Sequence, residues 1–224
     1  QNAESGEYGV SADTLLLYQP VEHPPVEVLN STDPLYFEFR LENSDGMYTY
    51  ARLSFAGKSG WRLQTKFLKS SEYNDNGAAQ RLALSIGKKS PSAVEEFPVE
   101  GPSDGISRLT ASDGSYVMLN TNKDSFRMDF YTASGAVASS VTNISTNRTG
   151  SILTGVLEEG EAIFGTGQRF DTTNQRGKYI DMFTKDIWSR ADASYMVIPL
   201  LCSSRGSGIF VNLYESMTMD LGYA

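Results

Sequence analysis

Apolar and polar side chains alternate along much of this chain, and an alternation of period two predicts β-strands rather than helices. Between residues 35 and 41 every second side chain is Leu or Phe, with Tyr36, Glu38 and Arg40 between them. This pattern is typical of a strand with one buried face. Asn43-Ser-Asp-Gly46 supplies a hairpin turn, after which the alternation resumes over 47–55.

Further short strands follow the same pattern, separated by turn signals such as Ser112-Asp-Gly114 and Ala133-Ser-Gly135. No long window keeps apolar residues at helical spacing. Turn signals about every 8–12 residues are typical of an antiparallel β-sandwich, so the sequence predicts an all-β fold without substantial helix. The expected strands are 14–19, 26–29, 35–41, 47–55, 61–68, 82–86, 106–111, 115–121, 126–131, 137–141, 152–156, 162–164, 179–183, 195–202, 209–214 and 217–221.

Three regions carry weaker strand signals. Residues 1–33 contain several prolines and are expected to form an extended segment that joins a β-sandwich over 34–224. Ser70–Gln80 and Gly87–Gly105 are polar, and we expect each to be a long surface loop of that sandwich. The chain starts at Gln1 rather than Met and has no charged-then-apolar leader, so we expect a processed or trimmed polypeptide.

Composition narrows the possible partners. The formal net charge is −8, from 19 Lys and Arg against 27 Asp and Glu, and the basic residues are scattered. Nucleic acids and anionic membranes attract a basic surface, so neither is expected as a partner, whereas a neutral sugar faces no such repulsion. No run approaches the roughly 20 apolar residues of a membrane-spanning helix.

Two single residues limit the chemistry. Cys202 is the only cysteine, which excludes an intrachain disulfide and a cysteine-based zinc site, and we expect it to be a small buried side chain. His23 is the only histidine and lies in a proline-rich segment, so histidine-dependent catalysis is not expected. The sequence predicts no cofactor and no metal.

The segment Gly165-Thr-Gly-Gln-Arg-Phe170 places two glycines one residue apart after a short apolar strand. A dinucleotide-binding fingerprint needs a third glycine where Phe170 stands, followed by a helix, so that interpretation fails. We expect the glycines to permit a tight exit from the strand. The polar stretch over 171–194 is rich in Asp, Arg and Trp, which is compatible with a sugar contact or with an ordinary solvated surface.

Several motifs in order carry a family resemblance. They are Gly165-Thr-Gly-Gln-Arg-Phe170, Met182-Phe-Thr-Lys-Asp186, Tyr195-x-x-Ile-Pro199, Ser203-Ser-Arg-Gly-Ser-Gly-Ile-Phe-Val-Asn212 and Met219-Asp-Leu-Gly222. In order and spacing they resemble the N-terminal β-sandwich of glycoside hydrolase family 31, which includes α-glucosidases, α-xylosidases and transglycosidases. The resemblance is strong over 161–222, and it implies a galactose-mutarotase-like supersandwich.

The resemblance also implies a functional loop. The family's aspartate that matches Asp186 lies on a loop over the active-site mouth of a catalytic barrel and contacts sugar hydroxyls. Trp188 and Lys185 flank this position and are expected to line the same rim. Lys185 replaces a commoner Arg and loses its planar fork, Gln168 replaces a Glu, and Ser207 replaces an aromatic residue, which indicates a divergent branch.

No catalytic residue is expected in this chain. Retaining glycosidases need two carboxyl groups about 5–5.5 Å apart. The resemblance implies that both lie in a (β/α)₈ barrel, which needs on the order of 250 residues that this chain does not contain. We therefore expect an accessory domain, inactive alone, with two partners: a barrel on the same or a cleaved polypeptide, and an oligosaccharide or α-glycoside substrate. The alternatives are a stand-alone carbohydrate-binding module, an aldose-epimerase-like enzyme with His23 as its only imidazole, and a structural sandwich.

Overall fold

The computed structural model describes residues 26–43, 46–56, 60–68, 94–122, 125–147, 150–169, 171–182, 184, 194–212 and 217–223. Within these ranges the regular structure is β-strand in antiparallel sheets, with no helix and hence none able to span a membrane, and the predicted all-β fold is confirmed. The strands are β1 Val26–Asn30, β2 Phe37–Glu42, β3 Tyr48–Ala56, β4 Trp61–Leu68, β5 Val94–Glu95, β6 Val99–Ser103, β7 Ile106–Thr110, β8 Tyr116–Asn120, β9 Arg127–Tyr131, β10 Val137–Thr146, β11 Ser151–Gly155, β12 Ile163–Arg169, β13 Tyr179–Asp181, β14 Ser194–Ser203, β15 Gly208–Phe210 and β16 Thr218–Asp220.

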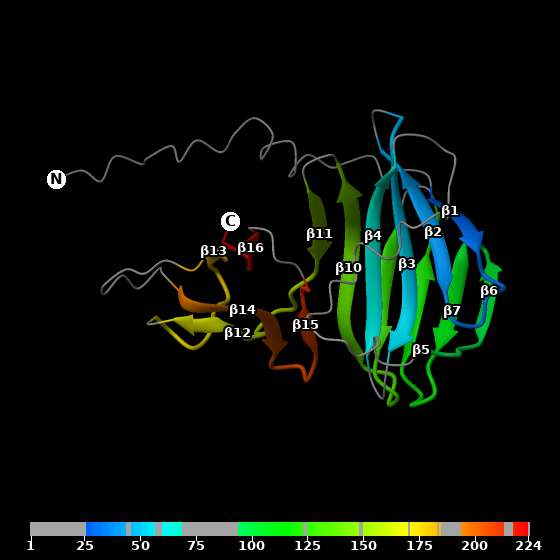
Figure 1. The fold of residues 1–224 in the computed structure, drawn as a ribbon. Coiled ribbons are helices and arrows are strands. Elements are labelled where there is room, and N and C mark those ends of the chain that lie inside the picture. The colour runs from blue at the N-terminus through cyan, green and yellow to red at the C-terminus, as the bar shows by residue number, and fades with distance from the viewer. Residues whose placement is uncertain are drawn as a thin grey trace.

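Two large sheets face each other and form the main sandwich (Figure 1). The first has the order β1-β2-β3-β4, with β5 paired to β3, and the second has the order β11-β10-β9-β8-β7-β6. Most neighbours in each sheet are also neighbours in sequence, because tight turns at the predicted places join them. At the turn after β2, for example, the Gly46 amide donates to the Asn43 carbonyl at 3.1 Å.

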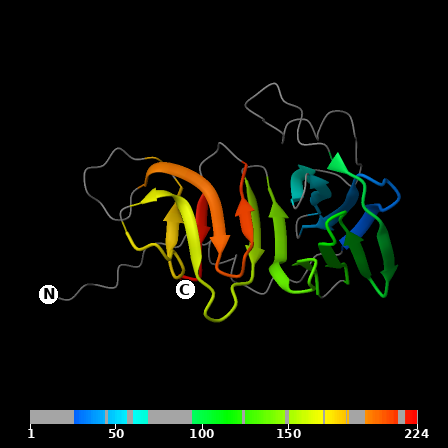
Figure 2. The same cartoon turned by 90° about the horizontal axis from the view of Figure 1, so that it is seen from below.

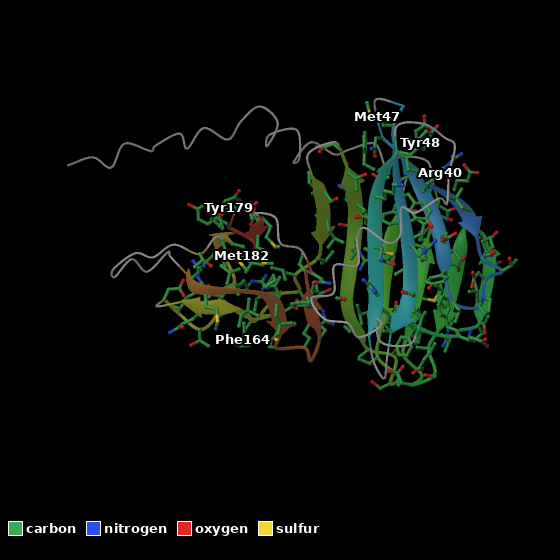
Figure 3. The ribbon with its side chains drawn as sticks, in the orientation of Figure 1. Arg40, Met47, Tyr48, Phe164, Tyr179 and Met182 are labelled. Carbon is green, nitrogen blue, oxygen red and sulfur yellow. The ribbon has the colours of Figure 1, made fainter. Side chains whose placement is uncertain are left out.

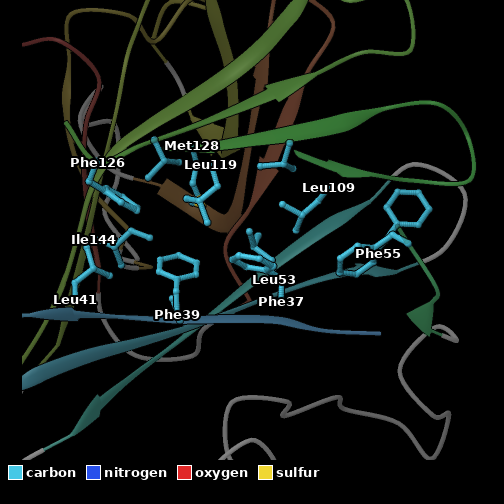
Figure 4. Close-up of a cluster of buried hydrophobic side chains, with 14 of the residues drawn as sticks. Phe37, Phe39, Leu41, Leu53, Phe55, Leu109, Leu119, Phe126, Met128 and Ile144 are labelled. Carbon is cyan, nitrogen blue, oxygen red and sulfur yellow. The ribbon is translucent and has the colours of Figure 1, made fainter. Parts of the chain in front are cut away.

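The inner faces of these sheets meet in one apolar core (Figure 4). Phe37 pairs with Leu53 and Phe39 with Ala51, so the alternating side chains of β2 and β3 point to the same side. The Phe39 ring lies 5.9 Å from that of Phe126. The buried members of the core are Phe37, Phe39, Leu41, Ala51, Leu53, Phe55, Phe97, Leu109, Ala111, Val117, Leu119, Phe126, Met128, Val141 and Ile144.

A pair of buried threonines links the two large sheets. The hydroxyl oxygens of Thr49 on β3 and Thr146 on β10 lie 3.0 Å apart, and the Thr146 amide donates to Thr49 Oγ1 at 2.9 Å. Asn43 completes the link by donating to the Thr146 carbonyl at 3.0 Å. These bonds satisfy polar atoms that burial would otherwise leave without water.

A second, smaller pair of sheets follows in the chain. It consists of β12-β14-β15 and β13-β16, and Figure 2 shows these strands, in yellow to red, beside the main sandwich. A separate apolar cluster fills the space between them. Its buried members are Ile163, Ile180, Met182, Met219 and Leu221, with Leu157, Val197, Leu201, Val211 and Met217 packed against them.

Some predicted boundaries differ from the structure. The region 87–105, expected as a loop, contains β5 and β6, so that prediction is wrong for its C-terminal half. β6 is the edge strand of its sheet and its pairing shifts after Glu100, which is where a sheet tolerates Pro102 and its missing amide hydrogen. The expected strands 14–19 and 82–86 lie outside the described residues.

We expect Phe39→Ala to lower the free energy of unfolding by about 3–5 kcal/mol, because the ring is fully buried between the sheets and its removal leaves a cavity. Chemical denaturation followed by fluorescence measures the change. Leu153→Ala is the control, since Leu153 is 47% exposed, and its cost should stay within about 0.5 kcal/mol. Equal costs for the two variants would contradict the assigned core.

Candidate functional site

The motif that begins at Gly165 forms the middle of β12, where this strand passes very close to β14. A Cβ atom at Gly165 would lie 2.1 Å from the Leu200 carbonyl oxygen, and one at Gly167 would lie 2.0 Å from that of Met196. Both glycines have positive φ, +111° and +100°, as does the buried Thr166 between them, at 68°. The glycines therefore permit a close strand approach and not the expected strand exit, because β12 continues to Arg169.

A partly buried polar cluster follows directly after β12. Lys178 Nζ lies 2.7 Å from Asp171 Oδ2, Gln175 Nε2 donates to Asp171 Oδ1 at 3.1 Å, and Arg169 Nε lies 3.6 Å from Asp171 Oδ2. Burial alone would raise the pKa of Asp171. The hydrogen bonds from Lys178 and Gln175 and the charges of Lys178 and Arg169 outweigh it and hold the pKa of this carboxyl below its usual value.

The loop over 171–177 folds back on the start of β12. Asn174 Oδ1 accepts hydrogen bonds from the amides of Ile163 and Arg176, each at 3.0 Å, and the Gln175 amide donates to the Ile163 carbonyl at 2.7 Å. Arg176 Nη1 donates to the carbonyls of Glu158 and Glu161 at 2.7 and 2.9 Å. These contacts hold the loop in one conformation, which gives it a structural role.

The segment that is predicted to be functional, residues 183–193, lies in the chain between Met182 and Ser194, and both of these residues have fixed positions. On its N-terminal side Met182 is buried in the second core, and its amide donates to the Met217 carbonyl at 2.9 Å. On its C-terminal side β14 begins at Ser194, which pairs with Arg169 of β12. Figure 3 shows Met182 and Tyr179 on the same side of β12. Asp186, Trp188 and Lys185 themselves lie outside the described residues.

The hairpin between β14 and β15 connects the smaller sheet pair to the main sandwich. Gly206 has φ +87° in the turn, as the sequence predicts for a tight hairpin. Ser207, which departs from the family's aromatic residue, donates through Oγ to the Ala138 carbonyl of β10 at 2.8 Å. Ser207 therefore joins the smaller sheet pair to the main sandwich. The sequence motif alone does not indicate this contact.

In the part of the chain that the structure describes, no group of three or more His, Cys, Asp or Glu side chains could hold a metal ion. The Asp171 cluster does not follow from the sequence prediction, although the opposite charges of Arg169, Asp171 and Lys178 at short spacing are a signal for it. The prediction that Cys202 is a buried side chain is wrong. Cys202 is exposed, because its position in β14 points away from the second core.

Comparison with known proteins identifies a family that this chain matches. Residues 50–220 match the family described as the glycosyl hydrolase 31 N-terminal galactose mutarotase-like domain. An α-xylosidase of Emericella nidulans is 31% identical over 65 residues, which are 29% of this chain and 8% of that protein. An isomaltosyltransferase of Sporosarcina globispora is 26% identical over 132 residues, 49% of this chain and 12% of that protein. The chain thus spans only a small part of each relative's length.

Solved structures share the fold. A cycloalternan-forming enzyme of Listeria monocytogenes, in complex with a pentasaccharide substrate, aligns with a TM-score of 0.64 and 16% identity over 90% of this chain and 18% of its own. A glycoside hydrolase family 31 dextranase of Flavobacterium johnsoniae, complexed with glucose, aligns with a TM-score of 0.61 and 14% identity over 92% of this chain and 24% of its own. At these identities the likeness concerns the fold alone.

We expect Gly167→Ala to destabilise the protein far more than Gly160→Ala. Both glycines have positive φ, but a Cβ at Gly160 meets nothing within 4 Å, whereas at Gly167 it meets the Met196 carbonyl oxygen. Gly160→Ala should therefore cost only the left-handed backbone strain of about 1–2 kcal/mol. Gly167→Ala should exceed it by at least about 2 kcal/mol in chemical denaturation. Equal costs would rule out the close approach.

Asp171→Asn tests the polar cluster through pH. Because the pKa of Asp171 is lowered on folding, its charge stabilises the protein above the usual value of 3.8, and this contribution is lost as pH falls below it. The melting temperature of the variant should lie below the wild-type value at neutral pH, and the gap between the two should narrow as the pH falls below 3.8. Asp113→Asn is the control, since an amide oxygen can still accept the Ser115 hydrogen bonds. A gap of constant size would contradict the assigned role.

Proposed function

The chain belongs to the glycosyl hydrolase 31 N-terminal galactose mutarotase-like domain family, and we propose that it is the accessory domain of a larger retaining α-glycoside hydrolase of the α-glucosidase or α-xylosidase type. In this role it packs on a catalytic (β/α)₈ barrel and contributes the loop around Asp186 to the substrate pocket. The observation that carries the proposal is the family match over 50–220, which contains this loop.

The geometry on either side of the loop supports this role. A loop that orients a substrate must have fixed ends, because an error of about 1 Å in position can cost a large factor in rate. Here Met182 is held in the second core and Ser194 starts a strand paired to β12. The close approach at Gly165 and Gly167 fixes β14 against β12, so it also fixes the point at which the loop ends.

The three proposed side chains have complementary chemistry for a sugar. The Asp186 carboxylate accepts hydrogen bonds from hydroxyl groups, and the Trp188 ring stacks on the apolar face of a pyranose. The Lys185 ammonium donates to ring or hydroxyl oxygens at the rim. None of them is assigned the nucleophile or the acid/base role, since both carboxyl groups of a retaining mechanism are proposed to belong to the barrel. The isolated chain is accordingly proposed to be inactive.

The names of the relatives support a substrate class. They include an α-xylosidase and an isomaltosyltransferase, and one structural neighbour holds a pentasaccharide substrate. All of these names concern glycosidic bonds. We infer that the complete enzyme acts on an oligosaccharide or α-glycoside, and that the Asp186 loop contacts the substrate from the accessory side.

In the complete enzyme, Asp186→Ala should lower kcat/KM by about 10- to 100-fold, the value of one hydrogen bond to a charged group. The melting temperature should change little, because the role proposed for Asp186 is contact with the substrate and not packing. Asp192→Ala, which removes the same charge from the same segment, is the control and should retain near wild-type kinetics. Unchanged kinetics of the Asp186 variant with an α-glycoside substrate would overturn the proposed function.

A further inference from the structure

The outer side of the three-stranded sheet β12-β14-β15 presents an apolar surface. Cross-strand partners in an antiparallel sheet point to the same side, and the pairs Phe164–Cys202 and Leu200–Phe210 set that side. Met196 and Ile198 share it by alternation along β14. We call this set the outer apolar face; its members are Phe164, Met196, Ile198, Leu200, Cys202 and Phe210.

The outer apolar face lies opposite the second core. Val197 and Leu201, which alternate with these residues along β14, pack against Ile163 and its neighbours inside the smaller sheet pair. Figure 3 shows Phe164 on the opposite side of β12 from Met182, which belongs to that core. The central strand is thus apolar on both sides, a pattern typical of a strand covered on both faces.

Four of the six members of this face are exposed in the described chain, and Phe164 and Leu200 are half-buried. Phe210 is 61% exposed, Met196 52% and Ile198 40%, and Cys202 is also exposed. None of the six side chains carries a charge, although the whole chain has a net charge of −8. A contiguous apolar patch of this kind is typical of an interaction site.

We propose that the outer apolar face is the surface on which the catalytic barrel of the complete enzyme docks. The inference rests on the proposed function and identifies the face through which it operates. The family match describes an N-terminal domain, and the chain covers 18% and 24% of two structural neighbours, so most of such an enzyme lies outside this chain. A second copy of this chain is a poorer occupant, because it would bring two strongly acidic molecules together.

The outer apolar face and the proposed substrate loop both depend on strand β14. β14 carries four of the six residues, and the same strand begins at Ser194, where the segment with Asp186 ends. A barrel docked on this face therefore lies next to the end of that loop. β14 therefore carries most of the docking surface and also fixes the end of the loop, so one strand sets the position of one relative to the other.

The only cysteine of the chain reports on this docking. In the native complete enzyme, a small maleimide should modify Cys202 at least about tenfold more slowly than Cys at position 134 in the Ser134→Cys variant, because a packed interface must open before it reacts. Ser134 is exposed in the turn between β9 and β10, which is not part of the outer apolar face. Mass spectrometry of the two peptides gives both rates in one sample, and unfolding in denaturant should make them equal.

A charged variant tests the same face independently. Phe210→Asp in the complete enzyme should speed the modification of Cys202 toward the rate of position 134. Ile106→Asp, which changes an exposed apolar residue of the main sandwich, should leave the modification of Cys202 slow.

Fast modification of Cys202 in the wild-type enzyme would overturn the docking proposal, even if Asp186→Ala impairs catalysis. If Cys202 loses its protection from maleimide on dilution, the docking proposal is also overturned, and a second copy of this chain becomes the occupant of the face. Stable protection together with unchanged kinetics of Asp186→Ala would uphold the docking face and overturn the substrate loop.

Discussion

The close approach of β12 and β14 is the constraint on which the smaller half of this molecule depends. Two carbonyl oxygens of β14 occupy the space that side chains at Gly165 and Gly167 would need, so only glycine fits. The pairing between the two strands shifts between Gly165 and Gly167, and alternate residues of β14 face the second core and the outer apolar face. The polar contacts of Asp171 and Asn174 then hold the chain that leaves β12.

Most of the architecture could be predicted from the period of the side chains. The alternation over 35–41 identifies the buried face of β2, and Gly46, Gly114 and Gly135 mark turns that the structure contains. Periodicity, however, says which residues share a face and not whether that face is covered. Cys202 was therefore expected inside, although it shares the exposed side of β14.

Pairing between distant residues explains other differences. Glu38 is buried because Arg52, its partner across β2 and β3, donates to its carboxylate at 2.6 Å and Tyr50 donates at 2.5 Å. Neither contact follows from the sequence of β2. The Asp171 cluster is similar, because it depends on a loop that brings Lys178 back to the end of β12. Asp186, Trp188 and Lys185 were assigned from motif order, and their assignment stays a prediction.

The threonine link between the large sheets has a consequence for how the chain folds. Thr49 and Thr146 are 97 residues apart, and the contact between them forms only after the chain has closed a loop of that length. Loop closure of this kind slows folding, and sandwiches dominated by such distant pairings fold on a timescale of about milliseconds to seconds. Hairpins such as β8-β9 need no such closure. Local hairpins are therefore expected to form first, and the joining of β3 to β10 late, as the step that completes the sandwich.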